Sequence, residues 1–233
     1  MQNVKKVLEN IEKFNNTTKL NKVMPGGDII YEPLINSKSK KSSGTRNYGY
    51  MIFSKEEYEP ALDKLKQCQR KHRYYYYEQL AKDNAKNVIF VMFNPSTACP
   101  NCDDPTIRNC RTLVENTYGS MEIINIYSQR NPNVKEIVKD DNEENLNFIK
   151  AFLGNRRGSD IVVAWGYGKK KKYKAQVEAV EKLLEDFNKY KIIVNKDAIK
   201  KIIKEFQNLD RHPAPTSWAV FKGFEHSAEL AKY

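Results

Sequence analysis

Long apolar runs are missing from this sequence, and histidine and cysteine are scarce. The longest apolar run falls far short of the roughly 20 residues that a membrane-spanning helix needs, so no transmembrane segment is expected. The first residues, "MQNVKKVLENIEKF", include acidic side chains and no apolar core, unlike a secretory signal. We therefore expect a cytoplasmic protein with no membrane partner.

Only four cysteines are present, and a domain of this size does not need a disulfide framework to fold. Free thiols are the simplest interpretation. Cys99 and Cys102 form a Cys-x-x-Cys pair, which Cys110 and one further ligand could complete as a metal site. A strong zinc signature has two such pairs, so we expect neither a metal nor another cofactor.

The signatures of several enzyme classes are also missing. There is no G-x-G-x-x-G, and "GYGKKKKY" lacks the spacing and the Ser or Thr of a Walker loop. The only histidines are His72, His212 and His226, with no Ser-His-Asp order or paired-carboxylate motif beside them. These absences exclude the familiar nucleotide-binding fingerprints and leave few groups for acid–base chemistry.

Positive charge, in contrast, is abundant. The formal net charge is +11, with basic clusters at 36–46, 70–73 and 169–174. Clustered lysine and arginine favour a polyanionic partner, and we expect DNA. A merely basic surface is the alternative. In the third cluster, the candidate DNA contacts are Lys169, Lys170 and Lys171.

The first part of the chain, residues 1–67, is predicted to be an extension of helix and strand with a flexible basic loop at 35–48. Apolar periodicity predicts helices at 1–15 and 55–67. The tyrosine-rich stretch 72–80 is typical of a strand. Its tyrosines could stack on bases, but alternate packing in the core is the favoured interpretation.

Residues 68–233 are predicted to form the main domain. Apolar runs predict buried strands at 87–93, 121–128, 160–166 and 191–194, and periodic segments predict helices at 105–119, 142–153, 174–190 and 196–208. Asp104 and Gly119 suit the start and stop of the first of these helices. This alternation predicts a three-layer α/β/α sandwich around a mainly parallel four-stranded sheet.

Unusual residues lie at or just after the carboxyl ends of the predicted strands, where parallel sheets bind ligands. Singly, each has an ordinary explanation, such as an Asn-Pro turn. Together they predict a cleft, to which 211–218 could return. The residues at the strand ends are Phe93, Asn94, Ser96, Asn125, Tyr127, Trp165 and Gly166.

These side chains support limited chemistry. Asn94 can orient a water, Asn125 can read the edge of a base or amide, and His212 can donate to a developing oxyanion. Such a site suits a reaction whose leaving group does much of the work, for example cleavage of a base from its sugar. Asp103 and Asp104 are undecided between catalysis and helix capping.

The stretches "VMFNPSTA", "DDPTIRNC", "INIYS", "VVAWG" and "RHP" closely resemble the bacterial and phage family called domain of unknown function 1643. The resemblance covers residues 68–220 and implies no activity by itself. The same layout more distantly resembles the uracil-DNA glycosylase superfamily.

The glycosylase resemblance implies residue roles. Asn94 would position the hydrolytic water, Asn125 would read the base, and Trp165-Gly166 would match a third strand end. The "HPAP" loop would supply His212 to the base oxygen and wedge the duplex with Pro213, Pro215, Thr216, Ser217 and Trp218. Ser96 replaces the usual glycine after Asn-Pro, and the predicted helix 196–208 precedes the loop, so a modified base is expected rather than uracil.

The resulting hypothesis is a DNA glycosylase that flips a base and hydrolyses its N-glycosidic bond. A non-catalytic nucleotide or nucleic-acid binding module is the alternative. This alternative is favoured if Asp104 serves only as the cap of its helix. A third possibility is an accessory protein with a nonspecific basic surface. The oligomeric state is left open by the sequence.

Overall fold

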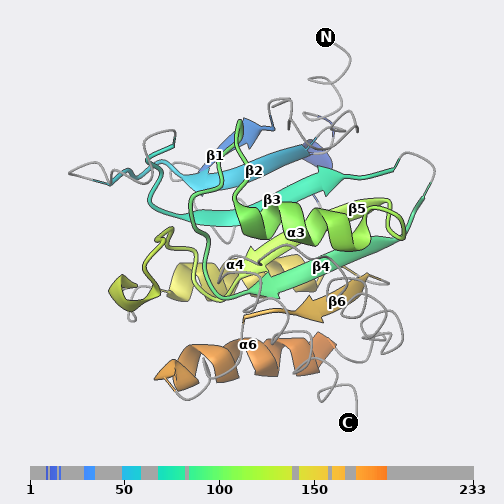
Figure 1. Ribbon diagram of the computed structural model, residues 1–233. Helices are drawn as coiled ribbons and strands as arrows, with labels where there is room; N and C mark the ends of the chain where they lie inside the picture. The colour runs from blue at the N-terminus through green and yellow to red at the C-terminus, as the bar shows by residue number, and fades with distance from the viewer. Residues whose placement is uncertain are drawn as a thin grey trace, which may run out of the picture.

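The computed structural model describes residues 9, 11–14, 16, 29–34, 49–58, 68–81, 84–137, 142–156, 159–165 and 172–187. Within these residues a six-stranded sheet runs through the molecule in the order β1-β2-β3-β5-β4-β6 (Figure 1). Helices lie on both faces of the sheet. The chain therefore has a mixed α/β fold.

One half of the sheet is antiparallel. β1 (Ile29–Pro33) pairs with β2 (Gly49–Ser54), and β2 pairs with β3 (Arg73–Gln79). β3 in turn pairs with β5 (Ser120–Asn125), again antiparallel. β3 confirms the strand predicted at 72–80. β1 and β2 lie in the extension, for whose strands no bounds were predicted.

The other half is parallel. β4 (Asn87–Met92) lies between β5 and β6 (Asp160–Val163) and runs parallel to both. The strands predicted at 87–93, 121–128 and 160–166 are thus confirmed as neighbours. The four-stranded, mainly parallel sheet is not confirmed, because three of the five pairings are antiparallel. The predicted strand 191–194 and helix 196–208 lie outside the described residues.

The helix predicted at 55–67 is wrong for its first residues. Residues 55–58 are not helical. Instead the Tyr58 N–H donates to the Gln69 carbonyl at 3.1 Å, and the Lys71 N–H donates to the Glu56 carbonyl at 2.8 Å. These bonds extend the β2–β3 ladder, which satisfies the backbone groups that a helix would have used. Residues 35–48 and 59–67 lie outside the described residues, and the domain division at residue 68 stays a prediction.

Two apolar cores sandwich the sheet. α3 (Pro105–Val114) packs on one face, and α4 (Glu143–Leu153) and α6 (Lys174–Phe187) pack on the other (Figure 1). Successive strand residues point to opposite faces, so Ile123 joins the α3 core and Ile124 joins the α4–α6 core. Because both faces are covered, β4 and β5 are built from nearly uninterrupted apolar runs.

More of the β3 tyrosines are buried than the predicted alternation of core and half-exposed side chains would allow. Tyr74, Tyr75 and Tyr76 are 3%, 0% and 0% exposed, and Tyr77 is half-buried. The pairing of β2 with β3 shifts register between Ile52 and Phe53. This irregularity lets two consecutive tyrosines, Tyr74 and Tyr75, join the same core.

The N-terminal helix is described only in part. Residues 11–14 are helical, and Phe14 packs into the α4–α6 core with its ring centroid 4.8 Å from that of Tyr75. Across the residues that are described, no helix has the length and apolar character needed to span a bilayer.

Gly119 does not end a helix, contrary to the prediction. α3 ends earlier, at Val114, and Gly119 leads into β5. A Cβ at Gly119 would lie 1.6 Å from the carbonyl oxygen of Asn84. The position therefore needs glycine because another part of the backbone approaches it closely.

Candidate functional site

The carboxyl ends of β4, β5 and β6 meet at one edge of the sheet. Met92 is in register with Asn125, and Val91 with Val163. Beyond the strands, the Tyr127 N–H donates to the Phe93 carbonyl at 2.9 Å, which keeps the two chain segments together. Asn94 and Asn125 therefore lie at the ends of neighbouring parallel strands.

The side chain of Asn94 is held in one orientation. Its Nδ2 donates to the carbonyl oxygens of Pro95 and Asn131, each at 2.8 Å. The Asn131 N–H returns a bond to the Pro95 carbonyl at 3.0 Å. The bond to Pro95 is the local turn contact considered from the sequence, and the bond to Asn131 adds a long-range clamp. Both donors of the amide are thus occupied, which fixes where Oδ1 points.

Asn125 is an orphaned amide. Its side chain is 1% exposed, and neither Nδ2 nor Oδ1 has a hydrogen-bond partner among the residues that the structure describes. Strand alternation puts it on the α3 face, with Met121 and Ile123. A buried polar group left unsatisfied costs about 1–3 kcal/mol. Such a group in a native protein calls for an explanation, and a bound ligand is one.

The aromatic candidates lie on the other face. Phe93, Tyr127 and Trp165 are 6%, 1% and 3% exposed and belong to the α4–α6 core. The Phe93 ring centroid lies 5.4 Å from that of Tyr127 and 4.7 Å from that of Tyr173. Their packing accounts for their burial without a ligand. The structure therefore places these rings and Asn125 on opposite sides of the sheet.

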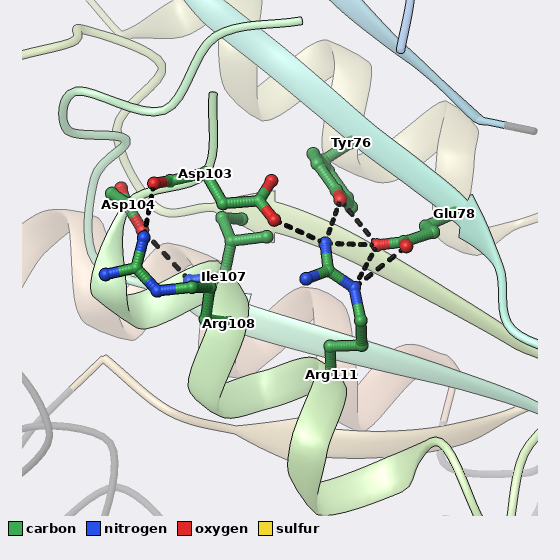
Figure 2. A network of polar contacts seen from close by, with 7 residues as sticks. All are labelled: Tyr76, Glu78, Asp103, Asp104, Ile107, Arg108 and Arg111. Carbon is green, nitrogen blue, oxygen red and sulfur yellow. Dashed lines mark hydrogen bonds and ion pairs between the residues drawn. The ribbon is translucent and has the colours of Figure 1, made fainter. Parts of the chain in front are cut away.

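Asp104 caps α3, as the sequence predicts. Its Oδ1 accepts from the Ile107 N–H at 2.9 Å (Figure 2). Pro105 then occupies the first turn, where its missing N–H costs nothing. The carboxylate of Asp104 therefore has a structural role at the start of the helix.

Asp103 is bound in an ion-pair network. Its Oδ2 lies 2.7 Å from Nη2 of Arg111. Arg111 also forms a bidentate pair with Glu78, in which Nε donates to Oε1 and Nη2 donates to Oε2, each at 2.8 Å (Figure 2). Burial alone would lower the pKa of Arg111, but the hydrogen bond to Glu78 and the nearby carboxylates raise it. The net result is a raised pKa. Neither Asp103 nor Asp104 is thus held as an uncommitted base.

Cys99 and Cys102 are joined by a disulfide, so they are not the free thiols that the sequence suggested. Their backbones also exchange hydrogen bonds, Cys99 N–H to Cys102 O at 2.8 Å and the reverse at 3.1 Å. Cys110 is a buried free thiol in α3, and burial raises its pKa. The described part of the chain contains no cluster of three or more potential metal ligands.

Two buried arginines lie near the same edge. Arg130 donates from its guanidinium to the carbonyls of Cys68, Arg70, Thr97 and Ala98, which ties two loops together. Arg73 is 2% exposed, and its Nε and Nη1 find no partner in the described ranges. Burial lowers the pKa of Arg73 to about 10, with Asp104 opposing and Arg130 adding to the shift.

A cavity of about 220 Å³ opens at this end of the sheet on the α4 side. It lies where β2 ends, β3 begins, β5 has just ended and α4 begins. Sequence reasoning missed it because its walls come from four separate segments. The lining side chains are Ser54, Lys55, Glu56, His72, Tyr74, Ser128, Glu144 and Asn145.

Of the other predicted site residues, Ser96 is half-buried in the loop after Asn94. The remaining candidates lie outside the described residues: Gly166, Lys169, Lys170, Lys171, His212, Pro213, Pro215, Thr216, Ser217 and Trp218. Their roles stay predictions.

The chain is similar to a known protein family. The model of the family described as "Protein of unknown function (DUF1643)" matches residues 73–213, from the first residue of β3 through β6 and α6. No curated protein and no solved structure matches the chain. Because the family model spans more than half of the 233 residues, the chain belongs to the DUF1643 family.

Proposed function

We propose that this protein binds a nucleobase at the carboxyl edge of β4 and β5 and hydrolyses its N-glycosidic bond. The observation that carries the proposal is the Asn125 amide, which is 1% exposed and unpartnered within the described chain. An amide offers one acceptor and a donor group side by side, which matches the hydrogen-bonding edge of a base. A bound base would satisfy both atoms at once.

Asn94 supplies the second part of the proposal. It lies at the end of the strand next to Asn125, and both of its amide donors are held by carbonyls. Its Oδ1 is then pre-oriented to accept a hydrogen bond from water. In the proposed step the water oxygen bonds to the sugar C1′, the C1′–N bond breaks, and its electron pair leaves with the base. The water proton passes to solvent.

Electrostatics at this edge favour an anionic product. Arg73 starts β3, and its N–H donates to the Ser128 carbonyl at 2.8 Å, three residues beyond Asn125. Its buried guanidinium lacks partners at Nε and Nη1 among the described residues. A buried cation of this kind stabilises negative charge strongly because little water screens it. A departing base anion or a nucleotide phosphate has the required charge.

A glycosylase-like arrangement of the sheet is part of this proposal. It is supported by the parallel order β5-β4-β6, with Asn94 and Asn125 at adjacent strand ends. DNA as the partner is supported by the net charge of +11. A modified base as the target, and His212 as the donor to its oxygen, rest on the sequence resemblance alone.

Binding without hydrolysis is the second candidate. The engagement of Asp103 by Arg111 and of Asp104 by the α3 backbone favours it, because neither of these two carboxylates is left as a base. The two candidates differ in one measurable respect. Hydrolysis leaves an abasic site, whereas binding alone leaves the nucleic acid intact.

The test is incubation of the full chain with single- and double-stranded DNA that carries uracil or a modified pyrimidine, followed by alkaline cleavage. We expect strand breaks at the target base, and a rate at least about 100-fold lower for Asn94→Ala. Asn155→Ala is a matched control, because Asn155 is an exposed asparagine just beyond α4 whose Nδ2 bonds only to its own helix, at Ala151.

The results separate the candidates. If the DNA stays intact, and if base-dependent binding is lost in Asn125→Ala, the hydrolysis proposal is rejected and the binding module is supported. Intact DNA with equal binding by wild type and Asn125→Ala would reject both.

A further inference from the structure

We propose that the cavity beside α4 is a second catalytic centre, in which Ser128 is an acyl-accepting nucleophile, His72 its base and Glu56 the residue that orients His72. The three side chains line one cavity of about 220 Å³. This inference is independent of the proposed nucleobase site. Tyr74 and the α4 residues place the cavity on the α4 side of the sheet, whereas Asn125 points to the α3 side.

The antiparallel half of the sheet brings the three residues together. β2 ends at Ser54, β3 begins at Arg73, and the chain leaving β5 runs past both. The Ser54 N–H donates to the His72 carbonyl at 3.0 Å, and the His72 N–H donates to Ser54 Oγ at 3.1 Å. On the other side, the Arg73 N–H donates to the Ser128 carbonyl at 2.8 Å. The backbone on both sides of His72 is therefore fixed.

The distances fit a nucleophile, a base and an orienting acid. Ser128 Oγ lies 2.9 Å from His72 Nδ1, which is hydrogen-bond distance. On the other side of the ring, Nε2 lies 3.7 Å from Glu56 Oε2. Compared with the usual serine hydrolase triad, the two ring nitrogens exchange roles. The order of hydroxyl, imidazole and carboxylate is the same, with Glu56 at ion-pair distance from the ring and beyond hydrogen-bond reach.

The imidazole and the carboxylate are each held in place. The His72 ring stacks on the Tyr74 ring with an interplanar angle of 11° and a centroid distance of 6.2 Å. Lys71 Nζ lies 2.6 Å from Glu56 Oε1, which leaves Oε2 as the oxygen nearer His72. A base whose orientation is set by ring packing and by a nearby carboxylate is pre-organised for proton transfer.

The proposed reaction is acyl transfer to water in two balanced steps. Ser128 Oγ bonds to the acyl carbon while its proton passes to His72 Nδ1, and the leaving group then departs with that proton. Water next attacks the acyl-serine, again giving its proton to His72, and the carboxylic acid leaves as Ser128 recovers its hydrogen. In both steps the carboxylate of Glu56 stabilises the imidazolium through Nε2.

The start of α4 forms one wall of the cavity. Glu144 and Asn145, in its first turn, line it. Asn142 at the N-cap makes no side-chain bond to the helix, and its Nδ2 donates to the Ile126 carbonyl at 2.8 Å. Glu143 and Glu144 place two carboxylates at the positive end of the α4 dipole, which disfavours an anionic substrate at this wall.

A second orphaned group in the cavity wall points to a ligand with a hydrogen-bond donor. Asn145 is 1% exposed and its Nδ2 donates to the carbonyls of Asn125 and Ile126. Its buried Oδ1 has no partner among the described residues. A substrate hydroxyl or amide N–H would satisfy it. Together with the small volume and polar walls, this favours small polar esters, thioesters or amides.

The test uses a fluorophosphonate probe on the full-length chain, with the site of attachment found by peptide mass spectrometry. Attack by Ser128 forms an Oγ–phosphorus bond and releases fluoride. We expect modification of Ser128, none in Ser128→Ala, and at least about 100-fold slower modification in His72→Gln. Ser120→Ala is the matched control, because Ser120 starts β5, whereas Ser128 follows the other end of that strand.

Glu56→Gln separates orientation from folding, because the Glu56 side chain is 55% exposed and its loss leaves the core intact. We expect slower modification and a downward shift in the pH midpoint of labelling, since the imidazolium loses its carboxylate. The charged or titratable groups around the imidazole in this cavity are Glu56, Lys55, Lys71, Tyr74 and Glu144.

Hydrolysis of 4-nitrophenyl acetate provides a substrate readout, with activity expected in wild type and in Ser120→Ala but not in Ser128→Ala. The proposal is overturned if folded wild-type protein leaves Ser128 unmodified. It is equally overturned if His72→Gln and Glu56→Gln label Ser128 at the wild-type rate. Because Asn125 lies outside this centre, the nucleobase proposal can fail without affecting these results.

Discussion

Arg111 on α3 and Glu78 on β3 form a buried, bidentate ion pair, with Nε 2.8 and 2.9 Å from the two carboxylate oxygens (Figure 2). The Glu78 side chain is 2% exposed and that of Arg111 is 14% exposed. Asp103 adds a second carboxylate at 2.7 Å from Nη2. This network fastens α3, and with it the loop that carries Asp103 and Asp104, to the sheet.

Arg111→Ala is expected to lower the free energy of unfolding by about 3–5 kcal/mol, because it leaves Glu78 buried without its cation. Urea denaturation followed by circular dichroism measures the change. Arg108→Ala is the control on the same helix. Arg108 is exposed and donates only to the Asp103 carbonyl, so its loss should change stability by no more than about 0.5 kcal/mol. Equal losses in the two variants would contradict the assigned role of the network.

Asp104→Ala is expected to cost about 1 kcal/mol, because the Ile107 N–H loses its cap. Asp104→Asn retains a side-chain oxygen at the cap and should cost less. The same pair tests chemistry at the nucleobase site. If Asp104 only caps α3, Asp104→Asn keeps any glycosylase activity, whereas a 100-fold loss would identify the carboxylate as a base.

Asn125→Leu is expected to raise the free energy of unfolding by about 1–3 kcal/mol while abolishing nucleobase binding. The change removes an amide whose two polar atoms are buried without partners in the described structure. Asn145→Leu is the matched control and should be destabilising, because the Asn125 and Ile126 carbonyls lose the donor at 3.0 and 2.8 Å. A destabilised Asn125→Leu variant would show that the amide is satisfied in the native protein.

The thiols are expected to react in a defined order with a disulfide reagent at pH 8. Burial raises the pKa of Cys110, so this thiol stays protonated at pH 8 and the reactive thiolate is not formed. Cys68 is half-buried and should react in the native protein. Unfolding without reductant should expose two thiols in total, and unfolding after reduction four. Four thiols before reduction would contradict the Cys99–Cys102 disulfide.

Local sequence predicted much of the parallel half of the sheet. The runs that became β4, β5 and β6 are apolar because both faces of these strands are covered. The Asp104-Pro105 start of α3 was also predictable, since capping depends on residues a few positions apart. Features that depend on residues close together in the chain can be predicted from the local sequence pattern.

The antiparallel half of the sheet was harder to predict from the sequence. No strand bounds were predicted for β1 and β2 within residues 1–67, and a helix was predicted where 55–58 continue the ladder. The pairing of β2 with β3 depends on register, which adjacent residues do not specify. Nothing in the local sequence indicated that Tyr74 and Tyr75 would enter the same core, because that follows from a register shift at Ile52 and Phe53.

The candidate sites divide in the same way. The sequence by itself determined that Asn94 and Asn125 follow apolar strands, and so lie at the ligand-binding edge of a parallel sheet. Only the tertiary structure decided that Asn125 is orphaned, that Phe93 and Trp165 pack on the opposite face, and that His72 lies 2.9 Å from Ser128. Such contacts join residues far apart in the chain, so no periodicity or spacing records them.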